Sequence, residues 1–197
     1  MKKGELTRRN IIQKSTTIFN KKGYMTTTMN DIIQETNIQK GGIYRHFESK
    51  EQLMVESFQF SVETMRDHFV QSVSQHNHTA DKLIAFVKAF LQLSEGKPLA
   101  GGCPIFNAAI EMDDLKGNVL LPKINEAMDM MINSLANMIE DGIRNQELKQ
   151  SIKPYDTAIY IVSTLEGGLV LDRLKKDGQL TNIIASNLKQ YISLIAT

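Results

Sequence analysis

A short segment near the N-terminus carries side chains suited to reading DNA. Gln39 and Arg45 can each form paired hydrogen bonds with base edges, and Lys40 and Tyr44 can hold phosphate oxygens. All four fall on the outward side of the short helix predicted there. The pattern predicts a surface that contacts nucleic acid.

Charge is unevenly distributed along the chain. Residues 1–50 carry ten Lys or Arg and four Asp or Glu, a net charge of +6. The rest carries 13 basic and 18 acidic residues, a net charge of −5. This asymmetry is typical of a basic module that docks on a polyanion beside a larger domain with another task. A chance solvated face is the alternative that charge alone leaves open.

The elements that must position these side chains are three helices, predicted at residues 7–22, 29–36 and 39–47. Thr28 and Asp31 form a capping box before the second, and Asn37 can make the tight turn before the third. This is helix-turn-helix spacing. A small core is predicted from Ile11, Phe19, Ile32, Ile33, Ile43 and Phe47.

Gly41 and Gly42 interrupt the third helix, and each weakens it by about 1 kcal/mol relative to Ala. Close approach to DNA would account for them, and so would close packing on a neighbouring helix.

Composition predicts an all-α protein of 197 residues. There are four prolines, none before residue 98, and ten methionines. No apolar run approaches the roughly 20 residues that span a bilayer, so we expect a soluble, cytoplasmic protein with no membrane partner. A single cysteine excludes an intramolecular disulfide and a cysteine-based zinc site. His76 and His78 lack a third donor, and no metal, cofactor or catalytic constellation is predicted.

Six further helices complete the predicted chain. Ser49 and Gln52 cap a long helix of about 25 residues, Asp81 caps the next, and Pro104 opens a helix that ends near residue 110. The last three are expected at residues 118–145, 154–176 and 180–195. Glu111, Asp113 and Asp114 are interpreted as a solvated helix end, with cation binding as the alternative.

Residues 6–54 closely resemble the DNA-binding domain of the tetracycline-repressor (TetR) family. The residues that carry the resemblance are Phe19 to Thr28, Ile32 and Ile33, and the run from Ile38 to Leu53, which includes Tyr44, Phe47 and Lys50. The resemblance implies a nine-helix fold. A helix-turn-helix DNA-binding domain at residues 1–50 would precede a helical ligand-binding and dimerisation domain at 51–197.

The resemblance also implies a homodimer on a pseudo-palindromic operator in double-stranded DNA. Thr28, Tyr44 and Lys50 would touch phosphates, and Gln39, Lys40, Gly42 and Arg45 would read bases, with His46 in the same contact set. Three residues depart from the family pattern. Asn37 replaces the usual turn glycine, Gln39 replaces a frequent Ser N-cap, and Gly42 replaces a side chain that often contacts DNA.

Glu166-Gly167-Gly168 resembles a segment in which small residues allow close packing across the family's dimer. The last two helices would then pair with their mates in a four-helix bundle. The expected interface residues are Ile159, Val162, Leu165, Leu169, Leu188, Tyr191, Ile192 and Ile195, although intramolecular core is the alternative for some of them.

A pocket for a small apolar effector of unknown identity is expected in the second domain. Its candidate lining is Phe86, Phe90, Cys103, Phe106, Asn107, Ile110, Met128, Met131, Leu135 and Tyr160. Ordinary core packing is the alternative for each of these side chains. Asn107 is the most suggestive, because a buried amide needs partners and a ligand could provide one.

Cys103 would sit at a helix N-terminus, where the helix dipole favours the thiolate. It resembles a cysteine that senses oxidants or electrophiles in one branch of the family, and a packing role is the alternative. The leading hypothesis is a repressor released from its operator by an effector or by modification of Cys103. A protein of the same fold that senses or interacts without binding DNA is the alternative. An enzyme is not expected.

Overall fold

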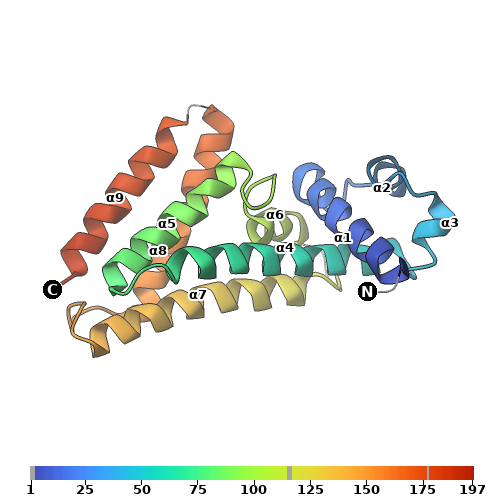
Figure 1. Ribbon diagram of the computed structural model, residues 1–197. Helices are drawn as coiled ribbons and strands as arrows, with labels where there is room; N and C mark the ends of the chain where they lie inside the picture. The colour runs from blue at the N-terminus through green and yellow to red at the C-terminus, as the bar shows by residue number, and fades with distance from the viewer. Residues whose placement is uncertain (1–2, 115–116, 177) are drawn as a thin grey trace. The chain divides into compact units, whose positions relative to one another are not determined.

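The computed structural model describes residues 3–114, 117–176 and 178–197, and these residues fold into nine α-helices and one short 3-10 helix (Figure 1). The elements are α1 (Lys3–Lys22), α2 (Met29–Thr36), α3 (Lys40–Ile43), α4 (Lys50–Val73), α5 (Thr79–Leu91), η1 (Gln92–Glu95), α6 (Pro104–Met112), α7 (Leu121–Arg144), α8 (Pro154–Lys175) and α9 (Gln179–Ile195). The predicted all-α class is confirmed.

Three predicted helix starts are wrong, and one of them is that of α7, which begins at Leu121 instead of residue 118. Helix α1 begins at Lys3, four residues before the expected position. Helix α5 begins at Thr79 with His78 as its N-cap, so Asp81 lies inside the first turn. The Glu147 carboxylate accepts a hydrogen bond from the Thr79 backbone N–H at 2.7 Å. A residue distant in sequence therefore satisfies the start of α5, and a local capping side chain is unnecessary.

The chain forms two compact units. The first comprises Met1–Met65 and Leu99–Glu126, and the second comprises Arg66–Pro98 and Ala127–Thr197. Helices α4 and α7 each contribute residues to both units. These two units are defined by contacts within the chain, and their bounds differ from those of the functional domains predicted at residues 1–50 and 51–197. The two functional domains stay a prediction.

The core of the first unit holds α1, α2 and α3 together. Five of the six predicted core residues are fully buried, and Ile33 is half-buried. Tyr24, which the core prediction omits, is also buried. Its ring stacks on Phe19 with centroids 5.6 Å apart and meets Phe58 edge-on at 6.0 Å. Burial raises the pKa of Tyr24 well above its ordinary value, against the opposing effect of a hydrogen bond with Ser61.

In the second unit, α5, α8 and α9 pack against one another (Figure 1). Phe69, Phe86 and Phe90 form an aromatic cluster with ring centroids 5.0 to 6.0 Å apart. Six of the eight residues expected at a dimer interface are buried within the single chain: Val162, Leu165, Leu169, Leu188, Ile192 and Ile195. They form intramolecular core, because α8 and α9 cover each other's apolar faces. Ile159 is exposed and Tyr191 is half-buried.

Candidate nucleic-acid interface

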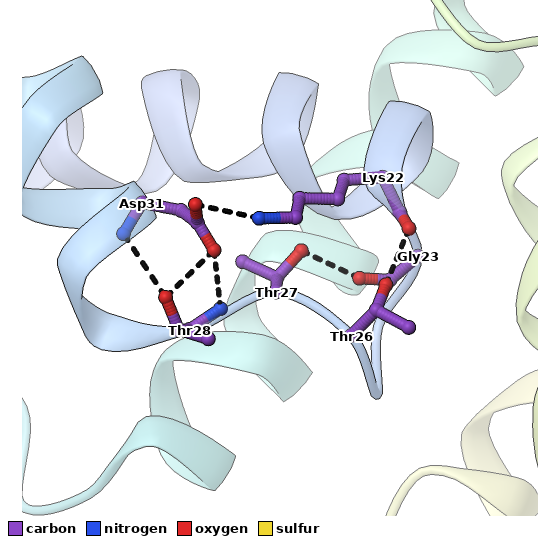
Figure 2. Close-up of polar contacts among 6 residues, drawn as sticks. All are labelled: Lys22, Gly23, Thr26, Thr27, Thr28 and Asp31. Carbon is purple, nitrogen blue, oxygen red and sulfur yellow. Dashed lines mark hydrogen bonds and ion pairs between the residues drawn. The ribbon is translucent and has the colours of Figure 1, made fainter.

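The start of α2 is fixed by the capping box that the sequence predicts (Figure 2). The Thr28 backbone N–H and hydroxyl each donate to Oδ2 of Asp31 at 2.7 Å, and the Asp31 N–H donates to the Thr28 hydroxyl at 3.2 Å. Because the hydroxyl proton points at Asp31, a hydrogen bond from Thr28 to a phosphate would require the hydroxyl to rotate. The predicted phosphate contact of Thr28 stays a prediction.

The last residue of α1 reinforces this start. Lys22 Nζ lies 2.6 Å from Oδ1 of Asp31 (Figure 2). Hydrogen bonds from Lys22 and then Thr28 hold the pKa of Asp31 well below its usual range. Asp31 is therefore ionised at neutral pH and links the end of α1 to the start of α2.

The turn between α2 and α3 is built on Asn37. Its backbone has φ 56° and ψ 33°, the left-handed conformation that asparagine tolerates better than most residues. Its N–H donates to the Ile33 carbonyl at 2.9 Å and so ends α2. The predicted turn residue is confirmed, because asparagine adopts the left-handed conformation that this turn requires.

Helix α3 is shorter than predicted. It covers Lys40–Ile43 only, and residues 44–46 form a turn instead of continuing the helix to residue 47. Gln39 occupies the N-cap but makes no capping hydrogen bond through its side chain. The two glycines and the missing cap both weaken the helix, which accounts for its length.

The predicted DNA-contacting side chains are largely exposed around this short helix. Gln39, Lys40, Tyr44 and Arg45 are exposed, and Lys40 Nζ lies 5.9 Å from the Tyr44 ring centroid. Gly42, His46 and Lys50 are half-buried. Ile43 and Phe47, in contrast, are buried in the core. The amphipathic pattern is confirmed, and contact with DNA itself stays a prediction.

A polar network that the sequence does not predict holds this region against α4. The Arg8 guanidinium lies 2.6 Å from the Glu56 carboxylate and 4.8 Å from the Phe47 ring centroid. Gln52 donates to Glu56 at 3.1 Å and accepts from the Glu48 N–H at 2.6 Å. The Gln52–Glu56 pair has i,i+4 spacing and could have been found. The contact to Arg8 spans 48 residues of sequence and has no local signal.

The second predicted capping box is half correct. The Gln52 N–H donates to the Ser49 hydroxyl at 3.1 Å, as expected. The Gln52 side chain returns to the N–H of Glu48, one residue before the expected partner.

Helix α6 is hydrogen-bonded to the end of α1. Asn107 donates to Oδ1 of Asn20 at 2.9 Å and to the Gly101 carbonyl at 2.8 Å, and Asn20 donates to the Ala100 and Gly102 carbonyls at 2.9 and 3.0 Å. Gly101 has φ 111°, and a Cβ there would lie 2.5 Å from the Asn20 carbonyl oxygen. Only glycine fits this close approach.

Glu111 completes the attachment. Its carboxylate accepts hydrogen bonds from the backbone N–H groups of Tyr24 and Met25, both at 3.0 Å. The interpretation of Glu111 as part of a solvated helix end is wrong, because its carboxylate accepts from two backbone N–H groups in the loop that follows α1. Asp113 and Asp114, which share that interpretation, are exposed. We call Asn20, Gly101, Asn107 and Glu111 the α1–α6 clamp.

The predicted effector-binding residues differ widely in exposure and divide between the two units. In the first unit, Cys103 is buried at the N-cap of α6, Phe106 and Asn107 are half-buried, and Ile110 is 61% exposed. In the second, Phe86, Phe90, Met131 and Leu135 are buried, Met128 is half-buried and Tyr160 is 49% exposed.

Three of these residues have surroundings that bear on the prediction. The Asn107 amide nitrogen has partners within the chain, so the argument that it needs a ligand no longer applies. Tyr160 lies on the surface of α8 against Tyr191, with ring centroids 4.8 Å apart. Ile110 projects into solvent. The effector pocket therefore stays a prediction.

A shallow groove of about 210 Å³ lies elsewhere in the second unit, between α5 and α9. It is lined by Ile84, Val87, Lys88, Ala185, Ser186 and Lys189, none of which was predicted to line a pocket. Across the described ranges, no three His, Cys, Asp or Glu side chains gather into a possible metal site. The helices found there also include none long and apolar enough to cross a bilayer.

The comparisons with known proteins agree with this architecture. Residues 11–56 match the family model of bacterial regulatory proteins of the tetR family, and residues 79–187 match that of the tetracyclin repressor-like C-terminal domain. A TetR transcriptional regulator from Chloroflexus aurantiacus J-10-FL is 35% identical with a TM-score of 0.93, over 100% of this chain and 98% of its own. A TetR-family regulator from Cytophaga hutchinsonii is 26% identical with a TM-score of 0.91, over the same shares.

A functionally named relative is similar over a shorter stretch. The biofilm operon icaADBC HTH-type negative transcriptional regulator IcaR of Staphylococcus aureus (strain Newman) is 31% identical over 81 residues. The match covers 41% of this chain and 44% of IcaR, so this chain spans less than half the length of that relative.

The fold and the exposed helix-turn-helix define a DNA-binding transcriptional regulator. The chain belongs to the TetR family, whose members bind operator DNA through this N-terminal element.

Proposed function

We propose that this protein is a homodimeric repressor that binds a pseudo-palindromic operator and is released by a small apolar effector. The observation that carries the DNA-binding part is the exposure of Gln39, Lys40, Tyr44 and Arg45 above the buried Ile43 and Phe47. The protein acts in the cytoplasm, where its operator lies. Repression is supported by IcaR, whose name describes a negative transcriptional regulator.

Within this proposal, the contacts divide into two kinds. Tyr44, Lys50 and Thr28 bind phosphates and set the position of the protein on the duplex. Gln39, Lys40 and Arg45 read base edges in the major groove, with Gly42 and His46 beside them. The Arg8 network supports these contacts because it fixes Phe47 and the residues before α4.

The dimer is supported by apolar side chains exposed on the last two helices. They are Tyr155, Ile159, Tyr160, Leu171 and Leu174 on α8, and Ile183 and Leu194 on α9. Clusters of exposed large apolar side chains are typical of interaction surfaces.

The two adjacent glycines of α8 differ in their surroundings. A Cβ on Gly168 would lie 3.0 Å from Ile184, whereas a Cβ on Gly167 would meet nothing within 4 Å. Gly167 is therefore the small residue available to a second copy.

Release by an effector requires a path from α6 to the DNA-binding helices. The α1–α6 clamp supplies a direct link, since Asn107 and Glu111 on α6 bind the end of α1. An effector that favours a displaced α6 would shift α1 with it. A hundredfold loss of operator affinity requires about 2.7 kcal/mol of differential effector affinity between the two states.

Modification of Cys103 is the second candidate trigger. The cysteine is the N-cap of α6 and lies one residue from the Gly102 carbonyl that accepts from Asn20. A bulky adduct there would disturb the clamp. Its side chain is buried, so an oxidant or electrophile would reach it only after a local opening.

The experiment is selection of operator sequences from random double-stranded DNA, followed by titration at two salt concentrations. Wild type and Cys103→Ser are compared before and after mild oxidant or electrophile. Loss of binding by wild type alone makes the thiol the trigger. Unchanged binding in both proteins directs the search to apolar compounds. If no sequence is selected even at low salt, the DNA-binding proposal is wrong and a non-DNA-binding sensor of the same fold takes its place.

A further inference from the structure

Helix α3 contains two adjacent glycines, Gly41 and Gly42, and neither has a positive φ. Both adopt a conformation that alanine adopts more readily, and alanine is the better helix former. Their conformation therefore gives no reason for glycine at either position. The reason must lie in what surrounds each Cα.

Gly42 is explained by packing within the chain. A Cβ built on this residue would lie 2.7 Å from Cγ2 of Ile38, closer than real Cβ contacts allow. Ile38 is β-branched, so it has little rotamer freedom with which to move away. The close approach of Ile38 to α3 therefore requires glycine at position 42.

Gly41 has no such explanation. A Cβ there would meet no atom within 4 Å, and the residue is exposed. Lys40 and Tyr44 flank it, with Lys40 Nζ 5.9 Å from the Tyr44 ring centroid, and both are exposed. Gly41 thus leaves a patch of bare backbone in the middle of the predicted DNA-contacting side chains.

We infer that Gly41 is a specificity-determining residue at which the backbone of α3 itself meets the DNA in the major groove. This inference rests on the proposed operator binding. Where the backbone of a helix directly contacts base edges, an added methyl group has no room, so it forces the helix away from the bases. The absent side chain therefore sets the depth at which Gln39 and Arg45 reach the bases.

The inference predicts opposite outcomes for the two glycines. Gly41→Ala leaves the free protein at least as stable as wild type, because the new methyl group meets open space. It lowers affinity for the selected operator by roughly tenfold or more, equivalent to about 1.4 kcal/mol. Gly42→Ala lowers the melting temperature because its methyl group collides with Ile38.

The test measures operator affinity and thermal unfolding for wild type, Gly41→Ala and Gly41→Leu, with Gly4→Ala as the matched control. Gly4 is also a helical glycine with nothing within 4 Å of an added Cβ. Gly41→Leu is expected to bind still more weakly than Gly41→Ala, and Gly4→Ala is expected to bind as wild type does. The slope of log affinity against log salt stays unchanged in the Gly41 variants, since no phosphate contact is removed.

Wild-type affinity and sequence preference in both Gly41 variants would overturn the inference while leaving the proposed DNA binding intact. An equal loss of operator affinity in Gly41→Ala and Gly4→Ala would also overturn the inference. If wild type itself selects no DNA, the proposed function fails and the inference fails with it.

Discussion

The side-chain amide of Asn107 donates a hydrogen bond to Oδ1 of Asn20 at 2.9 Å and so joins α6 to α1 across 87 residues of sequence. The same nitrogen donates to the Gly101 carbonyl at 2.8 Å. One amide thus holds together three parts of the first unit: α1, the loop before α6, and α6 itself. This arrangement gives Asn107 a structural role that requires no bound ligand.

Replacement of Asn107 by alanine removes this donor and leaves the Asn20 and Gly101 oxygens short of a partner. We expect the free energy of unfolding to fall by about 1–3 kcal/mol, the usual effect of an unsatisfied buried polar group. Denaturant titration measures the change. Asn187→Ala, at an exposed asparagine of α9, is the control and should leave stability unchanged. An unaltered midpoint for Asn107→Ala would mean that the clamp contributes nothing to the fold.

The pH dependence of stability provides a second test, at Asp31. Lys22 and Thr28 hold the Asp31 pKa below its unfolded value of about 3.9, so the ionised form stabilises the folded state. This stabilisation is fully present above the unfolded pKa and is lost as pH falls through the folded pKa. Asp31→Asn removes it at every pH. The melting temperature of wild type should exceed that of Asp31→Asn at pH 7, and the gap should narrow steadily below pH 4.

High salt should narrow the same gap at pH 7, because the Lys22–Asp31 ion pair is partly exposed. A gap that is independent of both pH and salt would contradict this account of the start of α2.

Phosphate and base contacts should separate by their dependence on salt and sequence. Lys50→Gln should weaken binding to all sequences alike and reduce the slope of log affinity against log salt by about one. Tyr44→Phe should likewise weaken binding uniformly. Arg45→Ala or Gln39→Ala should relax preference at particular base pairs, by about 1–3 kcal/mol for each lost base contact. Fluorescence titration against the selected operator and single-base variants measures both effects. If Gln39→Ala keeps wild-type affinity and preference, the docking register is wrong.

The features that could be predicted from the sequence are those with local signals. The Thr28–Asp31 capping box, the left-handed Asn37 and the buried pattern of Ile32, Ile43 and Phe47 all depend on spacings of a few residues. The sequence predicts a longer α3 than the structure contains. The helical spacing of its apolar residues continues to Phe47, but the two glycines weaken the helix locally.

The contacts that could not be predicted join residues far apart in the chain. From the sequence alone, Glu111 is expected to be a solvent-exposed acid. In the fold, the loop after α1 places two backbone N–H donors beside its carboxylate. Arg8 pairs with Glu56 only because α1 and α4 are neighbours in the fold. The residues of α8 and α9 that are predicted to form the interface follow an apolar periodicity. Periodicity does not tell whether an apolar face is covered by the same chain or by another copy.

The oligomeric state tests whether the exposed apolar side chains of α8 form the dimer interface. Leu174 on α8 is 73% exposed, so Leu174→Glu should fold normally as a single chain. If this side chain is buried between two copies, the substitution removes about 1.5–3 kcal/mol of favourable free energy from apolar burial in each copy. It also introduces a charge into the interface. Because a twofold interface contains the change twice, the dimer dissociation constant should rise by on the order of a hundredfold or more. Sedimentation or light scattering across a concentration series measures this shift. Val70→Glu on α4, at another exposed apolar residue, should remain dimeric. A Leu174→Glu protein that dimerises as tightly as wild type would place the interface on other residues.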